Sequence, residues 1–172
     1  MKKLLSALCA LSLVTLSFTG CASNAAPKGN ADTEKTNFKV AIVQQLDHSS
    51  LDEIRLAMEQ ELDAKAAEKN ITLTYKEFNG QNDASVLNQI GAQVVSDGYD
   101  AILPIATLAA TTMATATEET KTPVIYAAIS DPASSELTGI ANVTGTSDAL
   151  NTQQIMDMLF AVQPNVETVG LL

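Results

Sequence analysis

Four short polar segments hold most of the side chains in this sequence that could bind a small molecule. They contain hydroxyl, amide and carboxylate groups and neither lysine nor arginine. The candidate binding residues are Gln44, His48, Ser49, Thr107, Leu108, Ala109, Ser130, Asp131, Thr146, Ser147 and Asp148. Each residue alone is better explained as a helix cap or a turn residue, because Ser, Thr and Asp are common in both roles. The set taken together favours a ligand site.

Thr107 and the residues after it form the sharpest candidate. Thr107 stands where a short apolar run passes into a helix rich in Ala and Thr. The start of a helix carries free backbone N–H groups and the positive end of the helix dipole, which suit a carboxylate. Asp131 and Asp148 are candidates for a ligand's ammonium group, with Asp131 favoured. Thr107 could also simply cap its own helix, and the sequence does not separate the two roles.

Catalytic and metal-assisted chemistry lack the residues that they need. His48 is the only histidine, so no histidine cluster can bind zinc, and neither G-x-G-x-x-G nor G-x-x-x-x-G-K-[ST] occurs. Ser49, His48 and Asp131 could be drawn as a triad. The sequence has no G-x-S-x-G elbow, however, and adjacent residues rarely face each other. We therefore expect no catalytic residue, no metal site and no cofactor.

Apolar runs that alternate with amphipathic helices must position the polar segments. Expected strands cover residues 38–46, 71–78, 101–107, 123–129 and, more weakly, 139–143. Expected helices cover residues 50–70, 83–98, 108–119 and 151–162. Ser50 and Asp83 are the expected caps of the first two helices. The alternation predicts an α/β fold with a doubly wound parallel sheet, whose strands end at one edge, where the polar segments meet.

The end of the sequence does not complete this pattern. Residues 144–148 are expected to form a loop before the helix at 151–162, and VETVGLL at 166–172 resembles the first strand of another α/β unit. A helix and a strand without partners cannot bury their apolar faces. We interpret residues 38–144 as an N-terminal α/β ligand-binding lobe and residues 145–172 as a hinge and the truncated beginning of a second lobe.

The beginning of the sequence is typical of a secretory signal peptide over residues 1–20. Lys2 and Lys3 precede an apolar run that is too short to span a bilayer comfortably. Phe18-Thr19-Gly20-Cys21 resembles the lipobox of bacterial lipoproteins, although Phe18 stands where an aliphatic residue is usual. The resemblance implies a lipid on Cys21 that anchors the protein to a membrane. Residues 21–37 are then a flexible linker, and the alternative is an N-terminal anchor helix that is not cleaved.

The charge of the chain makes nucleic acid an improbable partner. The formal net charge is −10, and removal of residues 1–20 would leave 8 basic against 20 acidic side chains. No basic patch remains that could neutralise phosphate groups. The acidic residues are scattered, so they mainly favour solubility.

Several segments together resemble the solute-binding lipoproteins of ABC transporters. They are VAIVQQLDHSSLDEIR, AILPIATLAA, PVIYAAISDP and NVTGTSD, in the right order between Lys39 and Leu172. The branch that they resemble has members that bind aromatic amino acids, tryptophan and tyrosine among them. The resemblance implies a type I periplasmic-binding-protein fold with two α/β lobes, a first hinge crossing near Val143–Asp148 and a ligand in the cleft. It also implies an extracytoplasmic, non-enzymatic protein that delivers a small solute, expected to be an amino acid, to a membrane permease.

Two alternatives remain open. The first is a type I binding protein for another solute, such as a sugar; sugar clefts commonly use stacking aromatic rings, and this chain has no tryptophan and few aromatic residues. The second is a secreted hydrolase with a flavodoxin-like sheet, which would need a nucleophile and a base that the sequence does not supply. Catalytic turnover, as opposed to saturable binding, would separate the two classes.

Overall fold

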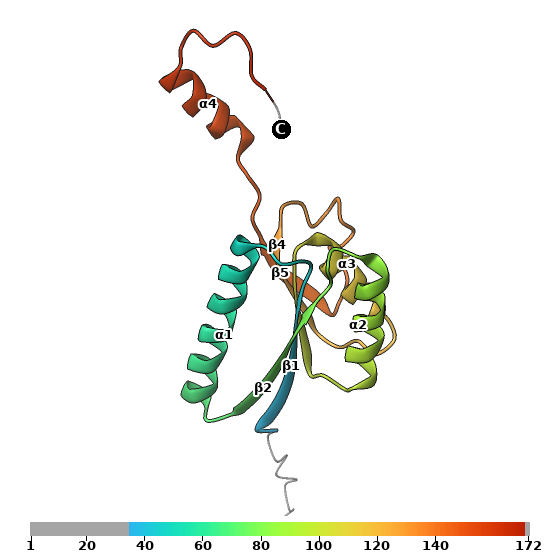
Figure 1. The fold of residues 1–172 in the computed structure, drawn as a ribbon. Coiled ribbons are helices and arrows are strands. Elements are labelled where there is room, and N and C mark those ends of the chain that lie inside the picture. Colours follow the sequence, from blue (N-terminus) through green and yellow to red (C-terminus); the bar gives the residue numbers. More distant parts are fainter. Residues whose placement is uncertain (1–34, 171–172) are drawn as a thin grey trace, which may run out of the picture. The chain divides into compact units, whose positions relative to one another are not determined.

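The computed structural model describes residues 35–170, in which a five-stranded parallel sheet forms the centre of an α/β lobe (Figure 1). The strands are β1 (Asn37–Gln44), β2 (Thr72–Asn79), β3 (Ala101–Ile105), β4 (Val124–Ile129) and β5 (Val143–Ser147), in the spatial order β2-β1-β3-β4-β5. The helices are α1 (Ser49–Lys69), α2 (Ala84–Ser96), α3 (Thr107–Ala116) and α4 (Thr152–Val162). The expected doubly wound parallel sheet is confirmed. The signal peptide at 1–20, Cys21 and the linker as far as residue 34 lie outside the described residues.

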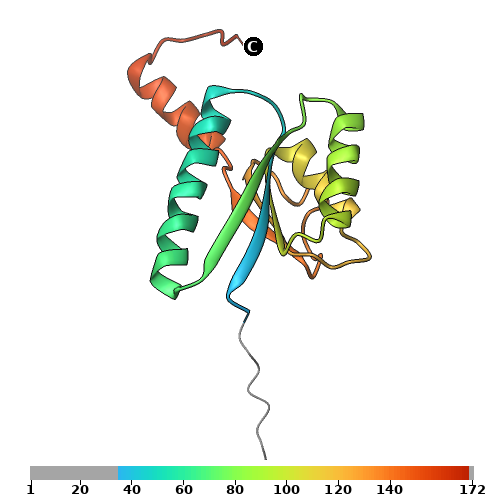
Figure 2. The same ribbon diagram turned by 60° about the horizontal axis from the view of Figure 1, so that its bottom comes forward.

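Strand β1 shows why helices cover both faces of the sheet. Val40 and Ile42 belong to a cluster that packs with α1, whereas Ala41 and Val43 belong to a cluster that packs with α2 and α3. Figure 2 shows the helices on the two faces of the sheet. Successive side chains of a strand point to opposite faces, so a strand that is apolar at every position is buried on both. The apolar residues of α1 that pack on its side are Leu51, Ile54, Met58 and Leu62. The continuous apolar run in the sequence therefore has its expected place, in the centre of the sheet.

The helix ends test the predicted caps. The Asp83 carboxylate accepts hydrogen bonds from the N–H groups of Ser85 and Val86, at 2.7 and 2.9 Å, which confirms it as the cap of α2. The prediction of Ser50 as the cap of α1 is wrong, because the helix already begins at Ser49. His48 has an extended backbone there, and its Nδ1 accepts from the N–H of Ser50 at 3.3 Å.

Strand β5 corrects the prediction for the last part of the lobe. The expected strand at 139–143 and loop at 144–148 are wrong: the strand runs over residues 143–147, in parallel register with β4 from Val124↔Val143 onward. It lies at the edge of the sheet, and only Val143 among its residues is buried, so it carries no apolar pattern. Gly145 passes so close to β4 that an added Cβ would lie 2.2 Å from the backbone oxygen of Tyr126.

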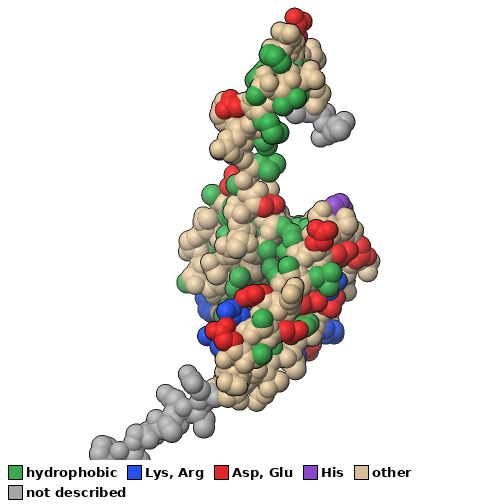
Figure 3. All heavy atoms as spheres, turned by 90° about the vertical axis from the view of Figure 1, so that its left-hand side faces the viewer, with side chains coloured by type: hydrophobic (Ala, Val, Ile, Leu, Met, Phe, Trp, Pro, Cys, Tyr) green, Lys and Arg blue, Asp and Glu red, His purple; other side chains and the backbone are tan. Residues whose placement is uncertain are grey.

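The segment after β5 contains α4, as expected, but no further strand. No residue of α4 is buried, and Ile155, Met158, Phe160 and Val162 are exposed (Figure 3). Residues 166–170 form no strand and pair with none of residues 35–170, so that VETVGLL as the first strand of a second lobe stays a prediction. Residues 171 and 172 lie outside the described part. Within residues 35–170, no helix is both long and apolar enough to cross a membrane.

Candidate functional site

The carboxyl ends of the strands meet at one edge of the sheet, as parallel pairing requires. The register aligns Gln44 with Ile105 and Ile105 with Ala127, and it aligns Ile129 with Ser147. The strand order 2-1-3-4-5 reverses its direction between β1 and β3. In open α/β sheets, ligands bind outside the carboxyl ends of the strands at such a switch point. The residues that follow β1 and β3 are therefore the first place to look for a ligand site.

Helix α3 begins at this switch point with an unusual residue. Ala106 precedes the helix with φ 76° and ψ 162°, a conformation that is essentially restricted to glycine, and it has no side chain that could cap the helix. Thr107 is the first helical residue and is exposed, so it does not cap α3. Among residues 35–170, the N–H groups of Thr107 and Ala109 have no acceptor. The N–H of Leu108 donates to the side-chain oxygen of Gln45, at 2.9 Å.

The three candidate residues of α3 present different groups to this edge. The side chain of Thr107 is exposed, and that of Leu108 is half-buried against the core. Ala109 is fully buried, backbone included, so that neither its side chain nor its N–H is exposed at this edge. A carboxylate could accept hydrogen bonds from the N–H and the hydroxyl of Thr107 without a cationic side chain, helped by the positive end of the helix dipole.

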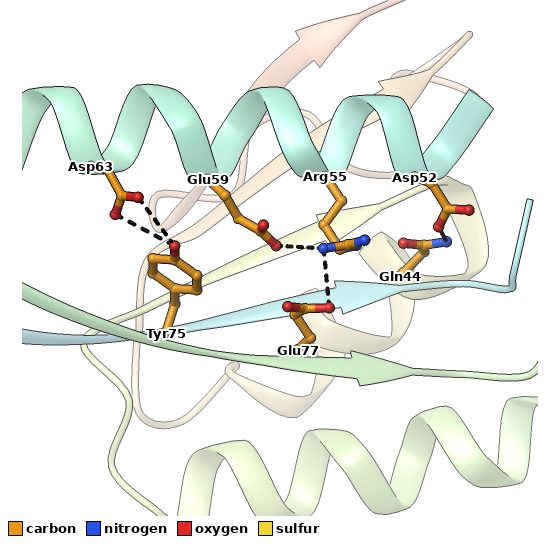
Figure 4. A network of polar contacts seen from close by, with 7 residues as sticks. All are labelled: Gln44, Asp52, Arg55, Glu59, Asp63, Tyr75 and Glu77. Carbon is orange, nitrogen blue, oxygen red and sulfur yellow. Dashed lines mark hydrogen bonds and ion pairs between the residues drawn. The ribbon is translucent and has the colours of Figure 1, made fainter. Parts of the chain in front are cut away.

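Gln44 does not belong to this open edge. Its side chain is only 4% exposed and lies between β1 and α1, where Nε2 donates to the Asp52 carboxylate at 2.9 Å and to the backbone oxygen of Leu46 at 2.7 Å (Figure 4). Farther along α1, Arg55 binds Glu59 at 2.7 Å and Glu77 of β2 at 3.1 Å, and the hydrogen bond that Arg55 donates to Glu59 is the main reason why the pKa of Arg55 is raised. These contacts hold α1 to the sheet. Gln44 thus has a structural role that its position in the sequence did not reveal.

Asp131 and Asp148 follow β4 and β5, and both are exposed. The two carboxylate oxygens of Asp131 accept from the N–H and the hydroxyl of Ser134, at 2.9 and 2.6 Å. The hydroxyl of Ser134, followed by its backbone N–H, holds the pKa of Asp131 below its ordinary value. One oxygen of Asp148 accepts from the hydroxyl of Ser130 at 3.0 Å, a bond that joins the ends of β4 and β5. Both carboxylates are engaged with nearby hydroxyl groups, Asp131 more completely.

The remaining candidates lie on the surface of the same edge. Thr146 and Ser147 end the edge strand β5 and are exposed, and the Ser147 hydroxyl accepts from the N–H of Ala149 at 3.2 Å. His48 and Ser49 are exposed at the start of α1, where His48 acts as the cap. Within residues 35–170, no three His, Cys, Asp or Glu side chains are close enough together to hold a metal ion.

The sequence reasoning missed Gln45 and Asn82. Gln45 is the residue that follows β1. Its side-chain oxygen accepts from the N–H of Leu108 in α3, and its side-chain nitrogen donates to the Asn82 side-chain oxygen at 2.8 Å. The alternation of side chains along a strand was the available signal, because it places Gln44 and Gln45 on different sides. Using that signal requires the exact end of β1, which the apolar run does not define.

The comparison with known protein families identifies the class. The sequence profile of the ABC transporter substrate binding protein family matches residues 39–172, and the chain belongs to this family. The tyrosine-binding protein of Clostridioides difficile (strain R20291) is 28% identical over 180 residues, which cover 99% of this chain and 52% of that protein. The chain thus spans about half the length of this curated relative.

Solved structures agree with the family and with the fold. A structure from Streptococcus pneumonia in complex with L-Trp has a TM-score of 0.63 and 34% identity, over 74% of this chain and 43% of that one. The ligand-free, open structure of a substrate binding protein with adhesive properties from Clostridium difficile has a TM-score of 0.66 and 27% identity, over 74% of this chain and 44% of that one. The predicted type I binding-protein lobe, in a branch with tryptophan and tyrosine binders, is confirmed.

Proposed function

We propose that this chain supplies the N-terminal ligand-binding lobe, residues 38–144, of an extracytoplasmic solute-binding lipoprotein that serves an ABC importer. Residues 145–172 would form the hinge and the beginning of a second lobe. The protein would capture a small solute between the lobes and deliver it to a membrane permease without chemical conversion. An amino acid is the proposed solute, with L-tyrosine and L-tryptophan as the first candidates, because relatives are described as a tyrosine-binding protein and as a complex with L-Trp.

The start of α3 is the observation that carries the proposal. The exposed N–H of Thr107, which has no acceptor among residues 35–170, lies at the switch point of the sheet. A ligand carboxylate would accept from it and from the Thr107 hydroxyl. The ligand's ammonium group would lie near the carboxylates after β4 and β5. The hydrogen bonds favour Asp148 for this role over Asp131, because Ser134 occupies both oxygens of Asp131.

Mass spectrometry of the ligand that copurifies with the full-length protein tests the proposal directly. We expect a free amino acid, and we expect calorimetric titration of the stripped protein to show saturable binding of L-tyrosine or L-tryptophan. The recovered ligand should be chemically unchanged after prolonged incubation. A copurified sugar would favour the alternative solute class, and turnover of the ligand would favour the hydrolase.

The proposed membrane anchor has its own test. A Cys21→Ala protein should move from the membrane fraction to the soluble fraction, because the lipid would be attached to that sulfur. Cys9→Ala is the matched control, since Cys9 lies within the proposed signal peptide, and it should leave the distribution unchanged. A Cys21→Ala protein that remains with the membranes would support an uncleaved N-terminal helix instead.

A further inference from the structure

Gln45 uses all four of its polar groups to join three separate segments. Its backbone N–H donates to the oxygen of Ile105 at 3.2 Å, and its backbone oxygen accepts from the N–H of Asn82 at 2.8 Å. Its side-chain Nε2 donates to the Asn82 side-chain oxygen at 2.8 Å, and its Oε1 accepts from the N–H of Leu108 at 2.9 Å. Asn82 is 37 residues away along the chain and Leu108 is 63 residues away. No local sequence pattern would reveal these contacts.

The bond to Leu108 supplies what α3 lacks. A helix cap is normally the residue before the helix, and its side chain accepts from the second or third helical N–H. Ala106 occupies that position and has no polar side chain. The side chain of Gln45 accepts from the second helical N–H in its place, from the neighbouring strand and directly at the β1/β3 switch point. The position of the first turn of α3 thus depends on a residue of another segment.

The bonds to Asn82 hold the turn between β2 and α2 against the same point. Gln81 and Asn82 have left-handed backbones, with φ 52° and 54°, which cost non-glycine residues free energy. Gly80 precedes them in very close contact, since an added Cβ would lie 2.9 Å from the backbone oxygen of Gln45. Such a turn persists when its surroundings determine it strongly, and Gln45 supplies both a backbone and a side-chain bond.

We propose that Gln45 is a positioning residue of the ligand site, which fixes the start of α3 and the 80–83 turn relative to the end of β1. It leaves the exposed N–H of Thr107 open and holds the first turn of α3 in one geometry. The part of this inference that concerns the ligand rests on the proposed function. The part that concerns the three segments does not, and the two are tested separately.

Amide hydrogen exchange of the ligand-free, full-length protein, followed by NMR, tests the positioning of the segments. Gln45→Met keeps the length of the side chain and removes both side-chain bonds, so the N–H of Leu108 should exchange about tenfold faster. Gln45→Glu keeps an acceptor for Leu108, and its exchange should stay close to that of the unaltered protein. Gln60→Met, on the exposed face of α1, is the matched control. It should change neither the exchange of the Leu108 N–H nor the NMR signals of Asn82. Unchanged exchange and unchanged Asn82 signals in Gln45→Met would overturn the proposal.

Gln45→Glu also provides a readout that a purely structural residue would not affect. The new carboxylate would be favourable at the helix start but would repel a ligand carboxylate beside it. We expect the affinity for L-tyrosine to fall at least about tenfold relative to the affinity for L-tyrosinamide, which lacks the carboxylate. Equal losses for both would show that Gln45 only supports the fold and would overturn its role at the site. An unaltered protein that binds neither compound would contradict the proposed function, and the exchange data would then decide the positioning of the segments alone.

Discussion

Helices α2 and α3 begin in two different ways, although both follow strands that end at the same edge of the sheet. Asp83 caps α2 from within its own segment and occupies the N–H groups of Ser85 and Val86. Helix α3 begins after a strained alanine without a cap of its own, and it receives one acceptor from a distant glutamine. In α2 the second and third N–H groups both have an acceptor in the same segment, whereas in α3 only the second has one, and another segment supplies it. The difference separates a helix start that serves the fold from one that can serve a ligand.

The largest expected effect comes from changing the start of α3, the open start, at Thr107. Thr107→Val keeps the shape of the side chain and removes its hydroxyl, and the loss of a hydrogen bond to a charged ligand costs ~1.5–3 kcal/mol. Calorimetry should therefore show roughly ten- to hundredfold weaker binding of the ligand. The melting temperature should not change, because the Thr107 hydroxyl makes no hydrogen bond within residues 35–170.

Thr115→Val is the matched control, since Thr115 is exposed two turns farther along α3. It should leave the affinity unchanged. An unchanged affinity in Thr107→Val, together with a lower melting temperature, would mean that this threonine supports the helix after all. The ligand site would then have to be sought elsewhere along the edge.

The start of α2, which Asp83 caps, is the closed start, and a change there should lower stability and leave the affinity for ligand unaltered. Asp83→Ala removes the cap of α2 and should lower the free energy of unfolding by about 1 kcal/mol, measured by urea titration. The affinity for ligand should remain within about twofold of its original value, because the change lies outside the open start. Asp83→Asn is the control, since an asparagine oxygen can accept the same bonds. A large loss of affinity in Asp83→Ala with full stability would remove the distinction between the two helix starts.

Strain at Ala106 sharpens the comparison further. The backbone at φ 76° and ψ 162° suits glycine, and its cost for other residues is of the order of 1–3 kcal/mol. Ala106→Gly removes the strain but adds flexibility to the unfolded chain, so we expect a net gain of about 1 kcal/mol in the free energy of unfolding. Ala114→Gly, in the interior of α3, should instead lose about 1 kcal/mol or more. If both substitutions destabilise the protein equally, Ala106 is not strained in solution.

The contrast between contacts within one segment and contacts between distant segments explains which parts of the structure could be predicted. The apolar run of β1 and the cap at Asp83 were predicted because each is decided by neighbouring residues. Strand β5 was misplaced because it is an edge strand with one buried residue, and its pairing with β4 is a long-range property. Gln44 was chosen and Gln45 overlooked because a shift of one residue at the end of a strand exchanges the two sides. The bond from Gln45 to Leu108 spans 63 residues, and no local pattern encodes it.

The smallest expected effect concerns the turn that follows β4, which resembles the closed start of α2. Asp131 accepts two bonds from Ser134, and its pKa is lowered chiefly by the Ser134 hydroxyl. A carboxyl group whose pKa is lower in the folded state stabilises the protein above the unfolded-state pKa of about 3.9 and ceases to do so as the pH falls through the folded-state pKa. The stability difference between the unaltered protein and Ser134→Ala should therefore be largest near neutral pH and should shrink below about pH 4. Because Asp131 is fully exposed, the difference should be small, and ligand affinity should not change. A difference that is constant with pH would show that the Ser134 hydroxyl does not act through the charge of Asp131, and a loss of affinity would return Asp131 to the list of ligand contacts.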